Sequence, residues 1–474
     1  MTNQKRCFSV ILQTQKNEEH TLQQMEGQKT PQELGTEKIG KLLLKYAIPA
    51  IIAMVASSLY NIVDRAFIGH GVDSLALSGL AVTFPLMNLS AALGSLVGVG
   101  SATMISLKLG QKDNNSALHV FGNCITLNII VGILFGALSL LFLNPILILF
   151  GASEATIGYA RDYMIIILLG NAFTHLYLGM NAVLRSAGHP NMAMSATIGT
   201  VVINTFLDWL FIMVFHWGIQ GAAIATVIAQ VLAFTWQCFK LSDKSELIHL
   251  QRGIFRPNWK LVRNIVTIGL PPCLMNAAAC LVVLLINRGL LSYGGDLAIG
   301  AYSIVNSLTF VFVMVVLGFN QAMQPIAGYN FGAGQPARVL QTLKMTLFYG
   351  TVVTTLGFIV GEFMTDSCIS IFTNDKELAQ IASTGMKLNF LVFPFVGSQI
   401  VTSNFFQSIG MPGKSIIMSL SRQVIILIPC LLILPNFYGI NGVWYSLPLS
   451  DAISVIIGFS LLIPQVRKIR ATIK

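Results

Sequence analysis

Two acidic residues lie in segments that are otherwise apolar enough to cross a membrane. Asp208 follows Asn204 by four residues in VVINTFLDWLFIMVF (201–215), and Asp64 lies in LYNIVDRAFIG (59–69). A spacing of four puts Asn204 and Asp208 on one face of a helix. A carboxylate inside a bilayer costs about 2.5 kcal/mol or more and is retained mainly where it faces a cavity or a partner. The pattern therefore predicts a buried polar site.

The composition is that of a membrane protein. Of 474 residues, 54% are hydrophobic and 10% are charged, whereas a soluble domain usually carries about 25% charged residues. The net charge of +10 does not indicate nucleic-acid binding, because the basic residues lie between apolar runs and are not interleaved with aromatic residues on one surface. The seven cysteines form no CxxC pair, which argues against a disulfide framework or a zinc site. We expect the lipid bilayer as a partner, and no nucleic acid.

Twelve apolar segments are long enough, at roughly 20 residues or more, to cross about 30 Å of hydrocarbon. They predict an all-α integral membrane protein with twelve transmembrane helices, near residues 43–66, 76–107, 117–143, 158–184, 192–215, 219–240, 262–290, 298–329, 338–364, 378–409, 414–436 and 441–465. Residues 1–37 are polar and do not resemble a signal peptide, so we interpret them as a disordered cytoplasmic tail. Most Lys and Arg residues in the loops fall on the side of that tail, which places both termini in the cytoplasm.

The longest connection, residues 241–261, is a cytoplasmic loop that divides the chain into two related halves. Short motifs recur in the same order about 222 residues apart. Pro49, Arg65, Gly71 and Asp73 recur as Pro272, Arg288, Gly294 and Asp296. RSAGHP (185–190) recurs as QSIGMP (407–412), and GIQG (218–221) recurs as GING (439–442). Two repeats of six helices share one orientation, so their pseudo-twofold axis runs along the membrane normal. The sequence thus predicts two six-helix bundles, an N-lobe (38–240) and a C-lobe (262–470).

The two halves differ in their acidic residues. Asn287 stands at the position in the second half that corresponds to Asp64, and Asp208 aligns near Pro429 and Cys430. The first half keeps two carboxylates where the second has none. We therefore expect ion chemistry to be confined to the first six spans.

These features resemble the multidrug and toxic compound extrusion (MATE) transporters, specifically the bacterial branch with its cation site in the N-lobe. The resemblance covers about residues 38–470 and rests on residues 49–80, the NxxxD of Asn204 and Asp208, the two SxGxP loops, and GYNFGAG (328–334). It implies a MATE-like fold, an inner-membrane location, and a cation-coupling cluster of Asp64, Asn204, Asp208 and Thr226. It also implies that Tyr60 and Asn181 line the substrate cavity and that the first helix bends at Pro49. The other main branch places acids in the seventh and tenth helices, and this chain has none there.

The chemistry of the cluster supports an ion site. Two carboxylates that share a site cannot both ionise easily, so the pair can hold or release a proton near neutral pH. Binding sodium instead needs further oxygen ligands, which Asn204 and Thr226 could supply. The sequence leaves open whether the ion is a proton or sodium, and whether these groups only bridge packed helices. No other metal and no cofactor is expected.

The resulting prediction is a secondary active antiporter, not an enzyme, that exports amphipathic or cationic drugs in exchange for protons or sodium by alternating access. We expect it to act as a monomer. In the second half, Arg422 and Asp451 either form a charged pair between spans or line the cavity. The alternative function is a flippase for a lipid-linked saccharide on the same two-lobed fold. A flippase would carry several basic residues in its cavity spans, whereas here Arg422 is the one that qualifies.

Overall fold

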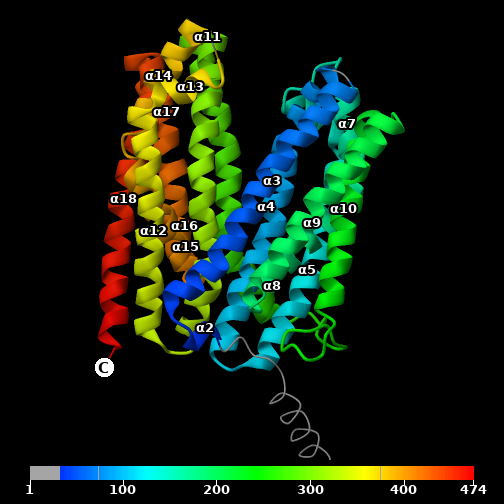
Figure 1. The fold of residues 1–474 in the computed structure, drawn as a ribbon, viewed down its shortest axis with the longest axis vertical. Helices are drawn as coiled ribbons and strands as arrows, with labels where there is room; N and C mark the ends of the chain where they lie inside the picture. Colours follow the sequence, from blue (N-terminus) through cyan, green and yellow to red (C-terminus); the bar gives the residue numbers. More distant parts are fainter. Residues whose placement is uncertain (1–32, 73, 374, 474) are drawn as a thin grey trace, which may run out of the picture.

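The computed structural model describes residues 33–72, 74–373 and 375–473, and these are almost entirely helical (Figure 1). Among them, ten helices are long and apolar enough to cross a membrane. An eleventh span is the pair α7 (Ile157–Leu169) and α8 (Asn171–Ser186), which is bent by 57°. The predicted span 378–409 is formed by α14 (Lys376–Phe390) and α15 (Phe393–Ser408), with a break between them. The predicted twelve-span, all-α membrane fold is confirmed, and two of its spans are broken helices.

The first half begins with the single turn α2 (Glu33–Thr36). Its remaining elements, besides α7 and α8, are α3 (Ile39–Gly71), α4 (Ser74–Gly110), α5 (Asn114–Leu141), α6 (Leu143–Leu149), α9 (Pro190–Asp208), the π-helix η1 (Trp209–Val214) and α10 (Gly218–Lys240).

The second half begins with α11 (Trp259–Gly332), which contains two spans, Trp259–Gly295 and Leu297–Gly332, joined at the non-helical Gly295. Besides α14 and α15 it contains α12 (Pro336–Phe363), α13 (Thr365–Ser370), α16 (Pro412–Leu420), the π-helix η2 (Ser421–Leu427), α17 (Ile428–Tyr438) and α18 (Ile440–Ala471).

The repeated motifs form the same turns in both halves. Gly188 and Gly410, in the two SxGxP loops, have φ of +98° and +73°, and the proline that follows begins α9 or α16. A proline suits the first helical position because its missing N–H has no partner there in any case. Gly218 and Gly439, in GIQG and GING, have φ of +60° and +55°. Glycine adopts this backbone conformation without steric cost, so the repeated glycines fix where each helix pair is joined.

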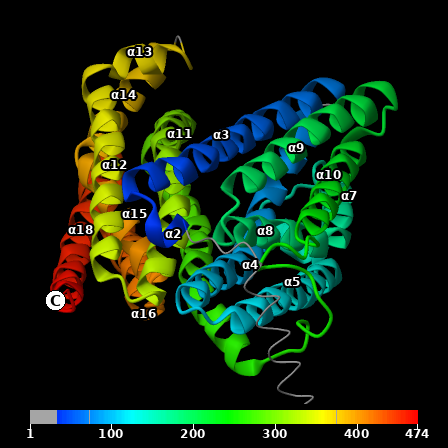
Figure 2. The ribbon, with the colours of Figure 1, turned by 60° about the horizontal axis from the view of Figure 1, so that its bottom comes forward.

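The helices form two bundles that meet at one end of the molecule and separate at the other (Figures 1 and 2). We call the end that carries α2 and the end of α18 the α2 face, and the end that carries α7 and α13 the α7 face. Near the α2 face, α4 of the first half packs backbone-to-backbone against α11 of the second. A Cβ added at Gly100 or Gly269 would lie 2.1 or 1.8 Å from a backbone oxygen of the other helix. The bundles can approach this closely because these positions carry no side chain.

Hydrogen bonds reinforce the same junction. Gln324 of α11 donates from Nε2 to the carbonyl oxygen of Val99 (3.2 Å) and to Oγ1 of Thr103 (2.8 Å), both on α4. Gln324 is 8% exposed, and a buried amide is stabilised by such partners. The structure is therefore closed between the lobes near the α2 face.

Helix α3 belongs to both bundles. Toward the α2 face, Leu42 and Tyr46 lie in an apolar cluster with Phe319 and Ile326 of α11. Toward the α7 face, Ile68 packs in a cluster of first-half residues. The predicted N-lobe of residues 38–240 thus begins with a helix whose first part packs on the second half.

Five residues of the predicted tail are ordered. Leu34 of α2 is fully buried, and the carbonyl oxygens of Leu34 and Glu37 accept hydrogen bonds from Nη2 of Arg338 at 3.0 and 2.8 Å. The rest of that prediction, residues 1–32, lies outside the described residues.

The connection between the halves packs against the first of them. Asn123 of α5 accepts a hydrogen bond from the backbone N–H of Asn258 (3.1 Å) and donates one to the carbonyl oxygen of Arg256 (3.4 Å). Glu246 lies 3.1 Å from Nε2 of His189, in the loop before α9. These contacts tie the 241–261 loop to the first bundle.

Candidate functional site

The polar pair on α9 is buried and internally hydrogen-bonded. Nδ2 of Asn204 donates to Oδ2 of Asp208 at 2.9 Å, and the two residues are 2% and 0% exposed. Asp208 is the last α-helical residue before η1. A π-helical turn rotates the residues around it relative to a regular helix and is frequent at functional sites. The i, i+4 spacing therefore brings the two side chains together on one face of the helix, as the sequence predicts. The amide of Asn204 orients the carboxylate of Asp208.

Two other helices bring their polar residues to the same region. Asp64 of α3 and Thr226 of α10 are 6% and 7% exposed. The hydroxyl of Tyr60, one turn before Asp64, lies 3.3 Å from Oγ1 of Thr226. Helix α3, which carries Asp64, packs against α9, which carries Asp208. The structure thus places Asp64, Asn204, Asp208, Thr226 and Tyr60 in one cluster built from α3, α9 and α10, which we call the carboxylate cluster.

The carboxylate cluster has acceptor capacity that the described residues do not use. Oδ1 of Asp64 and Oδ1 of Asp208 are both buried, and neither has a hydrogen-bond partner in the described part of the chain. The Asn204 amide donates its N–H to Asp208, which leaves its carbonyl oxygen as an acceptor. A buried, unpaired charge is strongly unfavourable, so these oxygens favour a bound proton or cation.

The donor set decides which ions fit. Carboxylate, amide and hydroxyl oxygens suit hard cations, whereas the described residues hold no group of three or more His, Cys, Asp or Glu side chains that could bind a metal ion. Two neighbouring carboxylates suit proton binding equally well. The cluster can therefore hold a proton or a sodium ion.

Sequence reasoning did not identify Tyr163. This residue of α7 is 2% exposed, and its phenol lies within electrostatic range of Asp64 and Asp208. A tyrosine in an apolar span has no distinguishing spacing in the sequence. Contact between α7 and α10 brings it to the cluster.

Asn181 lies apart from the carboxylate cluster. Its Nδ2 donates to the carbonyl oxygen of Ala193 and to Oγ1 of Thr197, both at 3.0 Å, and its Oδ1 accepts from Arg185. Ala193 and Thr197 lie on α9, and Thr197, the nearer of the two to Asp208, precedes it by eleven residues. Eleven residues correspond to about 16 Å of helix. Asn181 therefore belongs to a separate network near the α2 face.

Pro49 lies inside α3, which the structure shows as one continuous helix. The residue is buried within the part of α3 that packs on α11, since Ile51 and Met54 beyond it also contact that helix. A proline removes one backbone hydrogen bond and weakens the helix at that point. This weak point of α3 thus lies within its contact with α11 and before the part of the helix that carries Asp64.

Arg422 and Asp451 form the charged pair that the sequence raised as one possibility. Nε of Arg422 on η2 lies 2.7 Å from Oδ1 of Asp451 on α18. Asp451 is 7% exposed as a whole residue. Asp451 is thus directly paired with a cation, whereas Asp64 and Asp208 form no ion pair with any described residue.

A two-lobed bundle of twelve spans, with two buried carboxylates close together in one lobe, defines a membrane transporter built from an internal duplication. The chain belongs to the MatE family, the MATE transporters, because that family's model matches residues 49–210 and again residues 271–432. The two matches begin 222 residues apart, as the repeated motifs predict. Members of this family are transporters and not enzymes.

Curated relatives and solved structures agree with the family. The chain is 26% identical over 415 residues to the multidrug export protein MepA of Staphylococcus haemolyticus, covering 88% of this chain and 91% of the relative. It is 27% identical over 416 residues to MepA of Staphylococcus aureus, covering 87% and 91%. The structure of the MATE multidrug transporter DinF-BH in complex with R6G matches with a TM-score of 0.84 and 36% identity, over 91% of this chain and 96% of that one. A MATE structure in a bent conformation, 20% identical, shares the fold with a TM-score of 0.88.

Proposed function

We propose that this transporter is a secondary active antiporter that exports amphipathic or cationic compounds in exchange for protons or sodium ions. The observation that carries the proposal is the carboxylate cluster, in which Asp64 and Asp208 each keep a buried oxygen without a partner among the described residues. Multidrug export in the MepA relatives, and R6G binding in the DinF-BH structure, support a small-molecule substrate. The flippase alternative is not favoured by these relatives.

Competition between ion and substrate at the cluster drives the exchange. When both carboxylates are ionised, the cluster attracts a cationic compound. A proton or sodium ion cancels that negative charge and weakens substrate binding, and linkage requires that substrate weakens ion binding by the same factor. The ion gradient supplies the energy, since one charge moving through 100 mV is worth about 2.3 kcal/mol.

Alternating access follows from the arrangement of the two bundles. They are held together near the α2 face by the α4–α11 contact and diverge toward the α7 face. With both termini in the cytoplasm of a bacterium, this is an outward-facing state of a monomer in the inner membrane. Bending of α3 at Pro49 moves Asp64 relative to Asp208, and so couples ion binding to the packing of α3 against α11.

The test is dye transport by the purified protein reconstituted in proteoliposomes, with a pH gradient and a sodium gradient imposed in separate experiments. The expected result is dye movement against its gradient under one of the two conditions. The active gradient identifies the coupling ion. Dye movement that is the same with either gradient and with none would contradict antiport.

A further inference from the structure

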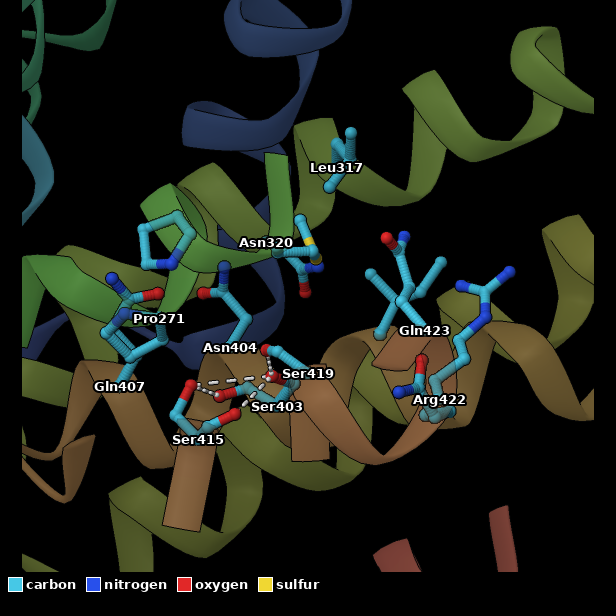
Figure 3. Close-up of a pocket in the computed structure, with 14 residues that line it drawn as sticks. Pro271, Leu317, Asn320, Ser403, Asn404, Gln407, Ser415, Ser419, Arg422 and Gln423 are labelled. Carbon is cyan, nitrogen blue, oxygen red and sulfur yellow. Dashed lines mark hydrogen bonds between the residues drawn. The ribbon is translucent and has the colours of Figure 1, made fainter. Parts of the chain in front are cut away.

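The second lobe contains a polar pocket that the carboxylate cluster does not use. It leaves a cavity of about 60 Å³ and is bounded by both spans of α11 together with α15, α16 and η2 (Figure 3). Its polar lining is dominated by amides and hydroxyls: Asn320, Gln399, Ser403, Asn404, Gln407, Ser415, Ser419 and Gln423. We call this space the amide pocket.

Part of this lining is satisfied by the protein itself. Gln399 and Gln407 donate from Nε2 to the carbonyl oxygens of Met418 (3.3 Å) and Ile268 (3.1 Å). The three serines hydrogen-bond to one another, with Oγ of Ser403 lying 2.9 Å from Oγ of Ser419. These groups join α15 to α16 and α11, and their role is structural.

Asn320 is different. It is 1% exposed, and neither Nδ2 nor Oδ1 has a partner among the described residues. Oε1 of Gln423, on η2 across the pocket, is also buried without a partner there. An unpaired buried amide is unfavourable, so its retention needs an explanation. Asn320 offers both a donor and an acceptor to a group that enters the pocket.

The charge of the pocket limits what that group can be. Its charged lining residue is Arg422, which is paired through Nε with Asp451 at 2.7 Å. A cationic group therefore gains nothing here, in contrast to the carboxylate cluster. Carbonyl, amide and hydroxyl groups match the free donors and acceptors of Asn320 and Gln423.

We propose that the amide pocket is a second substrate subsite, which binds an uncharged hydrogen-bonding group of the transported compound through Asn320 and Gln423. The cationic part of that compound binds at the carboxylate cluster of the other lobe. This inference rests on the proposed drug export and names which lobe recognises which part of the substrate. Affinity for compounds with such groups then depends on the second lobe, and affinity for simple cations does not.

The test compares two probes that differ in hydrogen-bonding capacity. Rhodamine 6G is a cation with an ester carbonyl and two N–H donors, whereas tetraphenylphosphonium is a cation with neither. Equilibrium binding of each is measured on the full-length protein in nanodiscs without any gradient, for the parent, Asn320→Leu and Gln423→Leu. Asn436→Leu is the control, because Asn436 lies on α17 outside the pocket.

Each pocket variant should weaken rhodamine 6G binding about ten-fold and leave tetraphenylphosphonium binding within about two-fold, while the control changes neither. Asn320→Leu should also raise the unfolding temperature of the ligand-free protein, because it removes an unsatisfied buried amide. The subsite would be overturned by equal losses of binding for both probes, or by unchanged rhodamine 6G binding in the pocket variants. It would also be overturned if the parent did not bind rhodamine 6G, or if Asn320→Leu had a lower unfolding temperature. Failure of gradient-driven transport with the probe difference intact would overturn only the antiport mechanism.

Discussion

The two lobes use one duplicated scaffold for opposite electrostatic arrangements. In the first, Asp64 and Asp208 are buried, and each has an oxygen without a partner among the described residues. In the second, Asp451 is equally buried but lies 2.7 Å from Arg422, and the neighbouring pocket is lined by amides and hydroxyls. A carboxylate paired with a guanidinium has little tendency to take up an ion, whereas an uncompensated one has a strong tendency. Under the proposed antiport mechanism, the first lobe responds to the ion gradient and the second does not.

The position of the π-helix also differs between the lobes. In the first, η1 follows Asp208 directly, so the carboxylate lies at the end of the regular helix. In the second, η2 begins nine residues after Pro412 and itself carries Arg422 and Gln423. The same span is thus irregular in both halves, at different depths, next to the polar groups that each lobe presents.

The largest expected effect comes from neutralising the first-lobe carboxylates. Asp208→Asn and Asp64→Asn should each abolish gradient-driven efflux, because the variant side chain cannot exchange a proton or balance a cation. Dye transport in proteoliposomes under the coupling gradient measures this, and yield and elution profile check folding. Glu362→Gln is the control, since Glu362 lies on α12 in the other half. Normal, gradient-dependent transport by Asp208→Asn would mean that the cluster only bridges helices.

Locking the lobes together should also stop transport, but reversibly. Ser106 of α4 and Gly328 of α11 lie on opposite lobes, and a Cβ at Gly328 would be 3.1 Å from Cβ of Ser106. Cysteines at both positions, in a background without native cysteines, should form a disulfide once the two helices separate by less than an ångström, since bridged Cβ atoms lie about 3.8 Å apart. Oxidation should block transport, and reduction should restore it. In each single cysteine variant, oxidation should leave transport unchanged. Full transport by the crosslinked protein would rule out separation of the lobes at this face.

Breaking the second-lobe ion pair should affect stability more than coupling. Arg422→Met alone leaves a buried Asp451 without its partner and should destabilise the protein by about 3–5 kcal/mol. The double variant Arg422→Met, Asp451→Asn should recover much of that loss, because no buried charge is left over. Thermal unfolding in detergent measures both, and the ion dependence of transport should match the parent in the double variant. If instead the double variant folds well but loses all ion dependence, the second lobe takes part in coupling.

The repeat and the Asn204–Asp208 pair could be predicted from the sequence because both depend on local chemistry, whereas the family resemblance implied that Asp64 and Thr226 join that pair. A four-residue spacing on a helix puts Asn204 beside Asp208 wherever that helix lies, and duplicated glycines and prolines impose the same turns twice. Features that depend on packing between distant spans could not be predicted. Hydropathy carries no information on which helices adjoin, so it did not show that α3 packs on α11, that Tyr163 reaches the cluster, or that Asn181 lies apart from it. Asn320 was missed because a single amide in an apolar span has no spacing signal.

The smallest expected effect concerns the balance between the two lobes. Gln324 lies on α11 of the second lobe, and its two hydrogen bonds to Val99 and Thr103 of the first bridge them near the α2 face. Gln324→Ala removes both, and a hydrogen bond contributes about 0.5–1.5 kcal/mol net. The equilibrium should therefore shift several-fold away from the state closed at the α2 face, without loss of either binding site. Spin labels on α5 and α12 at that face should report a larger population of long distances. The control is Thr346→Ala, because the Thr346 hydroxyl donates a hydrogen bond within α12, and it should leave that population unchanged. An unchanged distance distribution in Gln324→Ala would show that these two hydrogen bonds do not contribute to this equilibrium, and that apolar packing between the lobes sets it.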